Sequence, residues 1–413
     1  MINSDLRRKM DKCKICKTQT KPVISFGKMP IANGFISSLN ADEFFYDLKV
    51  LFCPNCFMVQ LGQIPRPEMM FGETYAYISS TSSAMADHFK QQADEIIRLV
   101  SKRKDPFVVE LGCNDGIMLK HIAEKGINHL GIEPANNVAD LAKKTGVRVL
   151  TEFFDQKSAQ KIARAHGPAD VICASNTLLS IENLNSAFEG FNILLRDNGL
   201  LFFEDPYLFD IVSLSSFDQI YDEHIYYFSG HSVRELAKRH GMKLVKMNHQ
   251  DVHGGSMCYY IKKGTAGRPS AQVAKWLKKE KGLKLDRITG YKRFKRNVDN
   301  ICRNLKNTLK KIKSGNNQIV GYGATSKSTT LLNYTRIGPK TIDYISDNTP
   351  TKIGKFTPGM HIPIKAHSQF TKDSPPFTVL FAWNHKKEIF QKEKDYRKKG
   401  GKFITYFPKV TIE

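Results

Sequence analysis

Short apolar runs followed by glycine-rich turns mark the central part of the chain. The run Phe107–Leu111 is almost wholly apolar, and residues 112–116 form a glycine-rich turn directly after it. Helical spacing of apolar positions follows over residues 117–126, and a second apolar run at 129–132 ends in Glu133. Short apolar runs bounded by turn residues are typical of strands buried on both faces. The pattern therefore predicts a strand–helix–strand unit with parallel strands.

Two further apolar runs extend the predicted sheet. Residues 170–174 lead to Asn176, and residues 199–204 have the same apolar character. Strands that alternate with helices predict a doubly wound α/β sheet, which binds its ligand at the carboxyl ends of the strands. Because Glu133 and Asn176 each follow a predicted strand, we expect both side chains to face that ligand.

The turn after the first strand is acidic, which restricts the ligand that it can hold. Glu110 precedes the turn, Asp115 lies within it, and its glycine pattern differs from the G-x-G-x-x-G of a phosphate-binding turn. Carboxylates repel a pyrophosphate but attract a sulfonium with an amino-acid tail, and Glu133 suits a ribose diol. We therefore predict S-adenosylmethionine as the ligand, with an NAD(H)-dependent dehydrogenase as the structural alternative. The predicted donor-binding residues are Glu110, Gly112, Asn114, Asp115, Gly116, Glu133 and Asn176.

Four of the eight cysteines form two C-x-x-C pairs. Each pair offers two thiolates on a tight turn, and two pairs complete the tetrahedral shell that Zn²⁺ prefers. Four cysteine ligands leave no coordination position open, so we expect a structural metal. Disulfide bonds and a redox pair are the alternatives, and neither pair opens a thioredoxin-like unit. The predicted zinc ligands are Cys13, Cys16, Cys53 and Cys56.

The positive charge is concentrated in the last third of the chain. The formal net charge is +23, and residues 265–413 alone hold 32 Lys and Arg against 10 Asp and Glu. Many of these residues fall within 275–313, which predicts a long basic helix. Such a helix has either a solvated basic face or a site that attracts a polyanion, namely a nucleotide diphosphate or RNA.

Chain length and hydropathy predict the number of domains and the cellular compartment. A chain of 413 residues predicts two or three domains. We expect no secretion signal, because the first residues lack an apolar segment. No apolar run approaches the roughly 18 residues that a membrane-spanning helix needs. We therefore expect a cytoplasmic protein without a membrane partner.

One segment combines acidic, aromatic and histidine side chains. Residues 217–229 read FDQIYDEHIYYFS, and His224 is the histidine among them. A histidine between aromatic residues is either packed in a core or placed to act as an acid or base near neutral pH. The composition of the segment alone does not separate a structural role from a catalytic one.

Six motifs occur in an order that resembles one known family. They read CKIC…FGKMPIANGF…LFCPNC, YAYISSTS, VELGCNDGIMLKHI…GIEPA, FDQIYDEHIYYFS, VHGGSM and GYGATSKSTTLLNY…DNTPTKIGKFTPGMHIPI. From Cys13 to Pro408 the chain resembles the sugar C-methyltransferases, which methylate nucleotide-linked 4-keto-deoxysugars at the carbon next to the ketone. The resemblance implies an α/β protein of three domains: a zinc-binding domain at 1–70, a class I methyltransferase domain at 71–264, and a Rossmann-like domain at 265–413 that binds the nucleotide-sugar.

Methylation of a carbon needs a base and a group that stabilises an enolate. An unactivated C–H bond is not nucleophilic, so a base must first remove the proton next to the ketone. His224 fits that base, and Tyr221 and Tyr77 fit as hydrogen-bond donors to the enolate oxygen. Glu223 fits a residue that either orients a hydroxyl or amine of the sugar or raises the basicity of a neighbouring group. Because adjacent strand residues point to opposite faces, we expect Glu223 and His224 to lie in a loop or at a strand end.

The remaining predicted substrate contacts are Tyr75, His253 and Lys327. Lys327 follows a second glycine turn at 321–325, where backbone N–H groups and positive charge suit a diphosphate. Ser180 and Asp222 depart from the family pattern, which usually has histidine at both positions. We expect a nucleotide-diphosphate keto-sugar as substrate, no nucleic-acid partner, and a monomer or small homo-oligomer. The alternatives are a zinc-containing RNA methyltransferase and a donor-binding scaffold without turnover.

Overall fold

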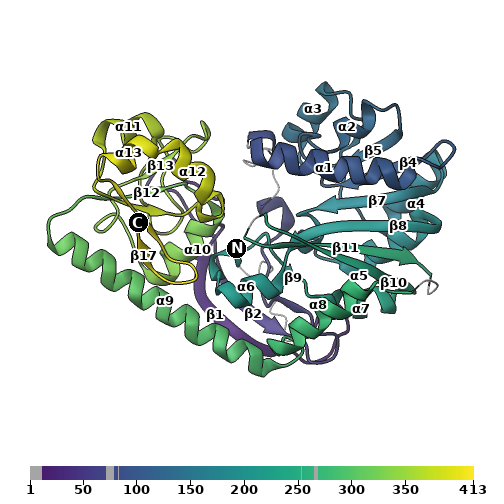
Figure 1. Cartoon of the computed structure of the whole chain (residues 1–413), viewed down its shortest axis with the longest axis horizontal. Helices are drawn as coiled ribbons and strands as arrows, with labels where there is room; N and C mark the ends of the chain where they lie inside the picture. Colours follow the sequence, from purple (N-terminus) through teal and green to yellow (C-terminus); the bar gives the residue numbers. More distant parts are fainter. Residues whose placement is uncertain (1–11, 71–78, 82, 253, 265–267) are drawn as a thin grey trace.

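The described part of the chain forms three sheets (Figure 1). The computed structural model describes residues 12–70, 79–81, 83–252, 254–264 and 268–413. Among the helices within these ranges, none combines the length and the apolar character that crossing a bilayer requires.

The first sheet has four strands, and its last strand comes from the middle of the chain. The order is β1-β2-β3-β9, and all neighbours are antiparallel. The strands are β1 (Lys21–Pro30), β2 (Phe45–Phe52), β3 (Val59–Leu61) and β9 (Tyr226–Tyr227). One C-x-x-C pair precedes β1 and the other connects β2 to β3. The sheet therefore joins the cysteine turns to the residues that directly follow His224.

The central sheet has seven strands in the order β10-β11-β8-β7-β4-β5-β6. Strands β4 to β8 are parallel, and β11 is antiparallel to both β8 and β10. The strands are β4 (Phe107–Leu111), β5 (Asn128–Ile132), β6 (Val149–Leu150), β7 (Ala169–Ser175), β8 (Leu195–Pro206), β10 (Met242–Gln250) and β11 (Ser256–Lys263). The helices are α1 (Ser83–Val100), α2 (Leu119–Ala123), α3 (Asn136–Lys144), α4 (Gln156–His166), α5 (Leu184–Leu194), α6 (Leu208–Leu214) and α7 (Gly230–Arg239), with short 3₁₀ turns η1 (Pro67–Met69), η2 (Ser79–Thr81), η3 (Leu178–Ser180) and η4 (Phe217–Gln219).

Alternation along the central strands explains why helices cover both faces of this sheet. Val109 of β4 belongs to a core that includes Phe188 of α5, whereas its neighbour Val108 belongs to a core that includes Phe89 of α1. Every residue of β4 is buried, as expected for a continuous apolar run between two helical layers. The predicted doubly wound α/β sheet is confirmed.

The third sheet has six strands in the order β14-β13-β12-β15-β16-β17. All neighbours are parallel except β16 and β17. The strands are β12 (Ile319–Tyr322), β13 (Ile345–Asp347), β14 (Ile364–Ala366), β15 (Phe377–Leu380), β16 (Lys402–Thr405) and β17 (Thr411–Ile412). The helices are α8 (Ala271–Gly282), α9 (Ile288–Ser314), α10 (Ser326–Thr335), α11 (His367–Asp373), α12 (Lys386–Lys392) and α13 (Lys394–Lys398), with the 3₁₀ turn η5 (Trp383–His385).

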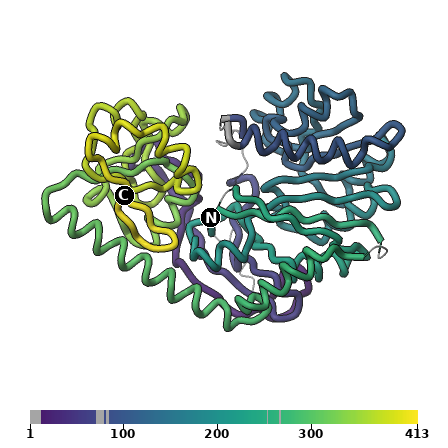
Figure 2. Tube along the Cα trace, viewed as in Figure 1, coloured from purple at the N-terminus to yellow at the C-terminus, as the bar shows by residue number. Residues whose placement is uncertain are grey.

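The basic stretch at 275–313 forms two helices rather than one. Helix α8 ends at Gly282 and α9 begins at Ile288, with Leu285 buried between them. Helix α9 turns one apolar stripe inward and its basic residues outward. The stripe packs against β1 and β12, so α9 bridges the first and third sheets. Figure 2 shows the purple N-terminal segment running beside this helix.

Candidate active site

The four predicted zinc ligands form one cluster. The Sγ atoms of Cys13, Cys16, Cys53 and Cys56 all lie within 4.8 Å of one another, and all four are free thiols. Sγ of Cys13 lies 3.5 Å from that of Cys56, and Sγ of Cys16 lies 3.4 Å from that of Cys53. Zn–S bonds of about 2.3 Å place tetrahedral sulfurs about 3.8 Å apart, so the cluster fits a zinc ion. Four thiolates fill the shell, which gives the metal a structural role.

Two matching turns present these thiols. In each turn the residue after the second cysteine, Lys17 or Phe57, has a φ of 61°. Its N–H donates to the carbonyl oxygen of the first cysteine, over 2.9 Å at Lys17 and 3.0 Å at Phe57. The C-x-x-C spacing thus folds into the same local structure twice, which is why spacing alone predicts the cluster.

The first sheet, which carries the cysteine turns, also includes the segment that follows His224. Strand β3 pairs with β9, and the N–H of Leu61 donates to the carbonyl oxygen of Ile225 over 2.8 Å. The side chain of Gln60, in the same strand, accepts the N–H of Lys14 over 3.1 Å. One strand therefore connects the first cysteine turn to the residue next to His224.

The predicted donor-binding residues meet at the carboxyl ends of β4 and β5. Glu133 accepts the N–H of Asn114 through Oε2 and the N–H of Ala135 through Oε1, both over 3.0 Å. Gly112 has a φ of 65°, and a Cβ atom at this position would collide with Thr177. The turn can therefore approach β7 this closely only with glycine at position 112.

Three acidic side chains are buried together around this turn. Glu110, Asp115 and Glu133 are 2%, 6% and 6% exposed. Burial, with Glu133 and Asp115 nearby, raises the pKa of Glu110 well above its ordinary value, and burial also raises the pKa of Glu133. A cationic ligand relieves this repulsion, so the turn fits the positively charged amino-acid and sulfonium groups of S-adenosylmethionine. Gly116, with a φ of 80°, completes the turn.

A buried network beside Asn176 went unpredicted. Asn176 follows β7 with a φ of 54°, and its N–H donates to the carbonyl oxygen of Glu204 over 2.7 Å. The Glu204 carboxylate accepts from His88, over 2.9 Å, and from Gln92, both on α1. Ser175 donates to the Gln92 side chain over 2.9 Å. These bonds tie α1 to the ends of β7 and β8, and nothing local in the sequence marks His88 for this role.

The segment around His224 forms the expected loop, between η4 and β9. Nδ1 of His224 lies 2.8 Å from the carbonyl oxygen of Gln219. Because a carbonyl only accepts, Nδ1 carries the proton and Nε2 keeps its lone pair. The ring of Tyr221 packs on that of His224, with centroids 4.0 Å apart. Burial, with a smaller effect of Lys327, lowers the pKa of His224 to about 3, so the imidazole is neutral at neutral pH.

Residues that follow β1 hold the two acids beside His224. Asn33 donates to Oε1 of Glu223 over 2.5 Å, and the N–H of Ala32 donates to Oδ1 of Asp222 over 2.9 Å. The hydroxyl of Ser180 donates to the carbonyl oxygen of Glu223 over 2.6 Å. Asp222 is fully buried, and burial raises its pKa to about 7. Ser180 and Asp222, where the family pattern has histidine, therefore both position the loop.

The third sheet reaches the same loop through Asp218. This residue is fully buried, and its Oδ2 accepts from the indole of Trp383 over 2.7 Å and from the hydroxyl of Tyr406 over 2.9 Å. Burial raises the pKa of Asp218 to about 7, while Lys327 opposes the rise. The structure thus gathers His224, Glu223, Tyr221 and Lys327 around one loop. Tyr75, Tyr77 and His253 lie outside the described residues.

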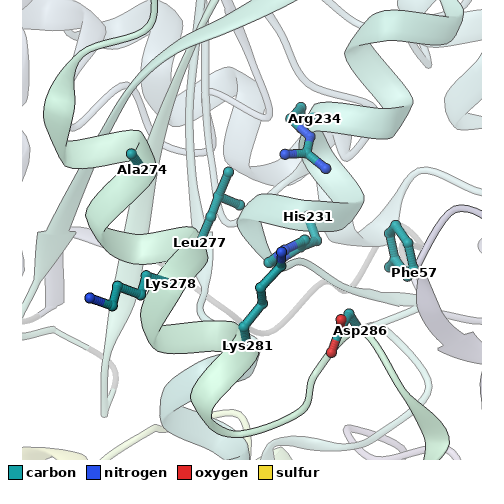
Figure 3. A pocket seen from close by; sticks show the side chains of 8 residues that line it. All are labelled: Phe57, His231, Arg234, Ala274, Leu277, Lys278, Lys281 and Asp286. Carbon is teal, nitrogen blue, oxygen red and sulfur yellow. The ribbon is translucent and has the colours of Figure 1, made fainter.

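A cavity of about 490 Å³ lies elsewhere, between α7, α8 and the second cysteine turn (Figure 3). Its lining residues are Phe57, His231, Arg234, Ala274, Leu277, Lys278, Lys281 and Asp286. Among the described residues, none of those predicted to act in catalysis or binding contributes to it. The site described above is therefore defined by its hydrogen bonds and not by this cavity.

Comparison with known proteins assigns the three parts of the chain. Family models match residues 13–71 as a zinc-binding domain, 85–247 as a methyltransferase domain, and 251–408 as a C-methyltransferase C-terminal domain. C-methyltransferase NovU of Streptomyces niveus is 29% identical over 414 residues, which cover 99% of this chain and 98% of NovU.

Two solved structures resemble less than half of the chain, and only loosely. Magnesium protoporphyrin IX methyltransferase (ChlM) of Synechocystis, with bound SAH, is 14% identical over 45% of this chain and 89% of its own, with a TM-score of 0.35. An S-adenosylmethionine-dependent methyltransferase of Clostridium acetobutylicum is 11% identical over 43% of this chain and 92% of its own, with a TM-score of 0.34.

The doubly wound sheet, with its acidic glycine turn and its matching methyltransferase model, defines an S-adenosylmethionine-dependent methyltransferase. The models on either side are those of a zinc-binding domain and of a C-methyltransferase C-terminal domain. The chain belongs to the S-adenosylmethionine-dependent C-methyltransferases that carry an N-terminal zinc-binding domain.

Proposed function

We propose that this C-methyltransferase methylates the carbon next to the ketone of a nucleotide-linked keto-deoxysugar. The resemblance of six motifs over nearly the whole chain supports this substrate class. The single observation that carries the chemistry is the tautomer of His224. Its Nδ1–H is bonded to the Gln219 carbonyl oxygen, so Nε2 is the basic nitrogen. A neutral histidine in a loop with Tyr221 and Glu223 supplies the base that carbon methylation requires.

His224 removes the proton next to the ketone through Nε2. The electron pair of the broken C–H bond forms the carbon–carbon double bond of the enolate, and the carbonyl π pair moves to oxygen. S-adenosylmethionine supplies the electrophilic methyl group when it is bound. Tyr221 donates a hydrogen bond to the enolate oxygen, with Tyr77 as a second donor. The imidazolium of His224 finally releases its proton to solvent.

Glu223 orients the sugar by accepting from a hydroxyl or amine. Asn33 donates a hydrogen bond to Oε1 of its carboxylate, and Ser180 donates one to its carbonyl oxygen. These bonds position both the side chain and the backbone of Glu223. Tyr75, His253 and Lys327 are the further substrate contacts that we propose. Together these residues account for recognition of the sugar around the carbon that is methylated.

The acidic turn after β4 binds the methyl donor. Glu110 and Asp115 pair with its positively charged groups, which offsets the repulsion between the buried carboxylates. Glu133 accepts from the ribose hydroxyls, and Gly112 lets the backbone approach the ligand. Asn114, Gly116 and Asn176 complete this side of the site.

Mass spectrometry of nucleotide-sugars incubated with the protein and S-adenosylmethionine tests this function. The panel contains 4-keto-6-deoxysugars on several nucleoside diphosphates, with the corresponding 4-hydroxy sugars as controls. We expect one keto-sugar to gain a methyl group bonded to carbon, and the 4-hydroxy sugars to stay unchanged. Binding of the donor without methylation of any keto-sugar would support the scaffold instead, and methylation of RNA would support the RNA methyltransferase.

A further inference from the structure

Lys327 lies on the face of α10 that packs against the loop of His224. It is the second residue of the helix. Thr330, one turn later on the same face, donates from its hydroxyl to the carbonyl oxygen of Ile220 over 2.7 Å. Thr329 donates to the carbonyl oxygen of Ala32 over 2.9 Å. These two bonds fix the first turns of α10 against the loop and so place the base of the Lys327 side chain.

The ammonium group of Lys327 acts on the titratable groups of the loop. After burial, it is the next cause that lowers the pKa of His224, and it opposes the rise that burial gives to the pKa of Asp218. Lys327 is half-buried, and burial lowers its own pKa. Within the described residues it has neither a hydrogen bond nor an ion pair. A half-buried cation without a bonded acceptor raises the free energy of the free enzyme, which points to a ligand as its partner.

A diphosphate matches the start of α10 poorly. Two backbone N–H groups there already have acceptors within the chain. The N–H of Ala324 donates to the carboxylate of Asp347 over 2.7 Å, and the N–H of Ser328 donates to the hydroxyl of Thr325 over 3.1 Å. The Asp347 carboxylate also repels a second anion at this turn. These two N–H groups are therefore not open to a phosphate, unlike those that hold phosphate at other helix starts.

The position of a cation beside a base limits what the cation can do. Proton transfer to His224 creates an imidazolium, which Lys327 repels, and an enolate oxygen, which Lys327 attracts. The attraction exceeds the repulsion when the ammonium contacts the oxygen directly and water is excluded. A lysine in this place favours the reaction only as a partner of that oxygen.

We propose that Lys327 binds the keto oxygen of the sugar and stabilises the enolate oxygen that forms when His224 removes the neighbouring proton. This role rests on the proposed function. The C–H bond breaks, its electron pair forms the C=C bond, the carbonyl π pair moves to oxygen, and the proton moves to Nε2 of His224. Lys327 keeps its protons and holds the oxygen through a charge-assisted hydrogen bond, together with Tyr221.

Lys327→Met tests the proposal, because it removes the charge but keeps an unbranched side chain. Two readouts distinguish binding of Lys327 to the keto oxygen from binding of Lys327 to the diphosphate. The first is exchange of the α-proton of the keto-sugar with D₂O, followed by NMR in the presence of S-adenosylhomocysteine. The second is the affinity for the free nucleoside diphosphate, which has a diphosphate but no ketone. Lys340→Met, at an exposed lysine of the same part of the chain, is the matched control.

We expect Lys327→Met to slow exchange at least about 100-fold, as loss of one oxyanion donor does, and to leave nucleoside diphosphate binding unchanged. Lys340→Met should alter neither readout. Normal exchange with weakened diphosphate binding would assign Lys327 to the diphosphate, and two normal readouts would leave it no role in the site. Lys327→Gln provides the same test if the methionine variant does not fold. Failure of the wild-type protein to exchange or methylate any keto-sugar would instead reject the proposed function.

Discussion

The Nδ1–H group of His224 donates a hydrogen bond to the carbonyl oxygen of Gln219 over 2.8 Å. Gln219 ends η4 and His224 lies in the loop that follows, so a backbone carbonyl five positions earlier sets the tautomer of the base. Burial lowers the pKa of His224 to about 3 and disfavours the imidazolium, and this effect outweighs the rise in pKa that the hydrogen bond to Gln219 gives. The outcome is a neutral imidazole with its basic nitrogen at Nε2.

The pH dependence of turnover should reflect this lowered pKa. A histidine at its ordinary pKa of about 6.5 loses activity as a base below neutral pH. With a folded-state pKa of about 3, His224 should still be neutral at about pH 5. We expect the acidic limb of kcat/KM to lie well below about pH 6.5. The carboxyls of Asp218 and Asp222 have pKa values of about 7, so a limb centred at about pH 6.5 would contradict the assignment if it were also present in Asp218→Asn and Asp222→Asn.

The same pKa shift affects stability. Between about pH 3 and 6.5, the unfolded chain binds a proton at His224 that the folded chain does not bind. The contribution of His224 to the free energy of unfolding is therefore present above this window and is lost as the pH falls through it. Urea unfolding of the wild-type protein and His224→Gln should converge across the window, because the variant cannot take up the proton.

Asn33 should control how well Glu223 binds the sugar. Asn33→Ala removes the donor to Oε1 of Glu223 and so holds the carboxylate in place less firmly. We expect KM for the keto-sugar to rise about tenfold, the effect of one hydrogen bond to a charged group, with a smaller change in kcat. Steady-state kinetics measure this split. Asn40→Ala, at an exposed position of the same segment, is the control, and equal KM values in the two variants would contradict the role of Asn33.

A methyl group on Gly112 should abolish donor binding for a steric reason. Gly112→Ala places Cβ against Thr177 and forces the turn away from β7. Gly126→Ala is a close control, because Gly126 has a φ of 68°, against 65° at Gly112, but nothing within 4 Å of the added Cβ. Both variants bear the cost of a left-handed alanine, and only the first bears the collision. Calorimetry should show S-adenosylmethionine binding by Gly126→Ala alone, and binding by both would show that the turn tolerates the methyl group.

Removal of zinc should impair the reaction without any contact between metal and substrate. The cysteine turns and β3 support β9, and Leu61 of β3 bonds to Ile225 beside His224. Chelation should therefore lower the melting temperature and turnover together, and added Zn²⁺ should restore both. Metal content, melting temperature and rate are measured on the same samples. Full turnover by protein shown to be free of zinc would contradict this link.

Local patterns in the sequence predict the parts of the molecule that depend on neighbours along the chain. The apolar run at Phe107–Leu111 predicts a strand covered on both faces, because such a run suits only that environment. The C-x-x-C spacing predicts the cysteine cluster, since each pair folds as its own turn. Successive side chains of a strand point to opposite faces, so Glu223 and His224 cannot share one face and a loop is predicted for them.

Contacts between distant segments leave no such local trace. Asn33 and Glu223 are 190 residues apart, and no periodic pattern connects them. The pairing of β3 with β9 depends on two or three residues per strand, too few to show alternation. The break between α8 and α9 is likewise set by burial of Leu285, which the basic composition of the stretch hides.

The most direct test of enolate formation by His224 is α-proton exchange without methyl transfer. Wild-type protein and His224→Gln are incubated in D₂O with S-adenosylhomocysteine and a keto-sugar nucleotide that the wild type methylates, and NMR follows the proton next to the ketone. We predict that the wild type replaces this proton with deuterium and that the variant does so at least about 100-fold more slowly, with its fold and donor binding intact. Exchange by the variant at the wild-type rate would contradict the account.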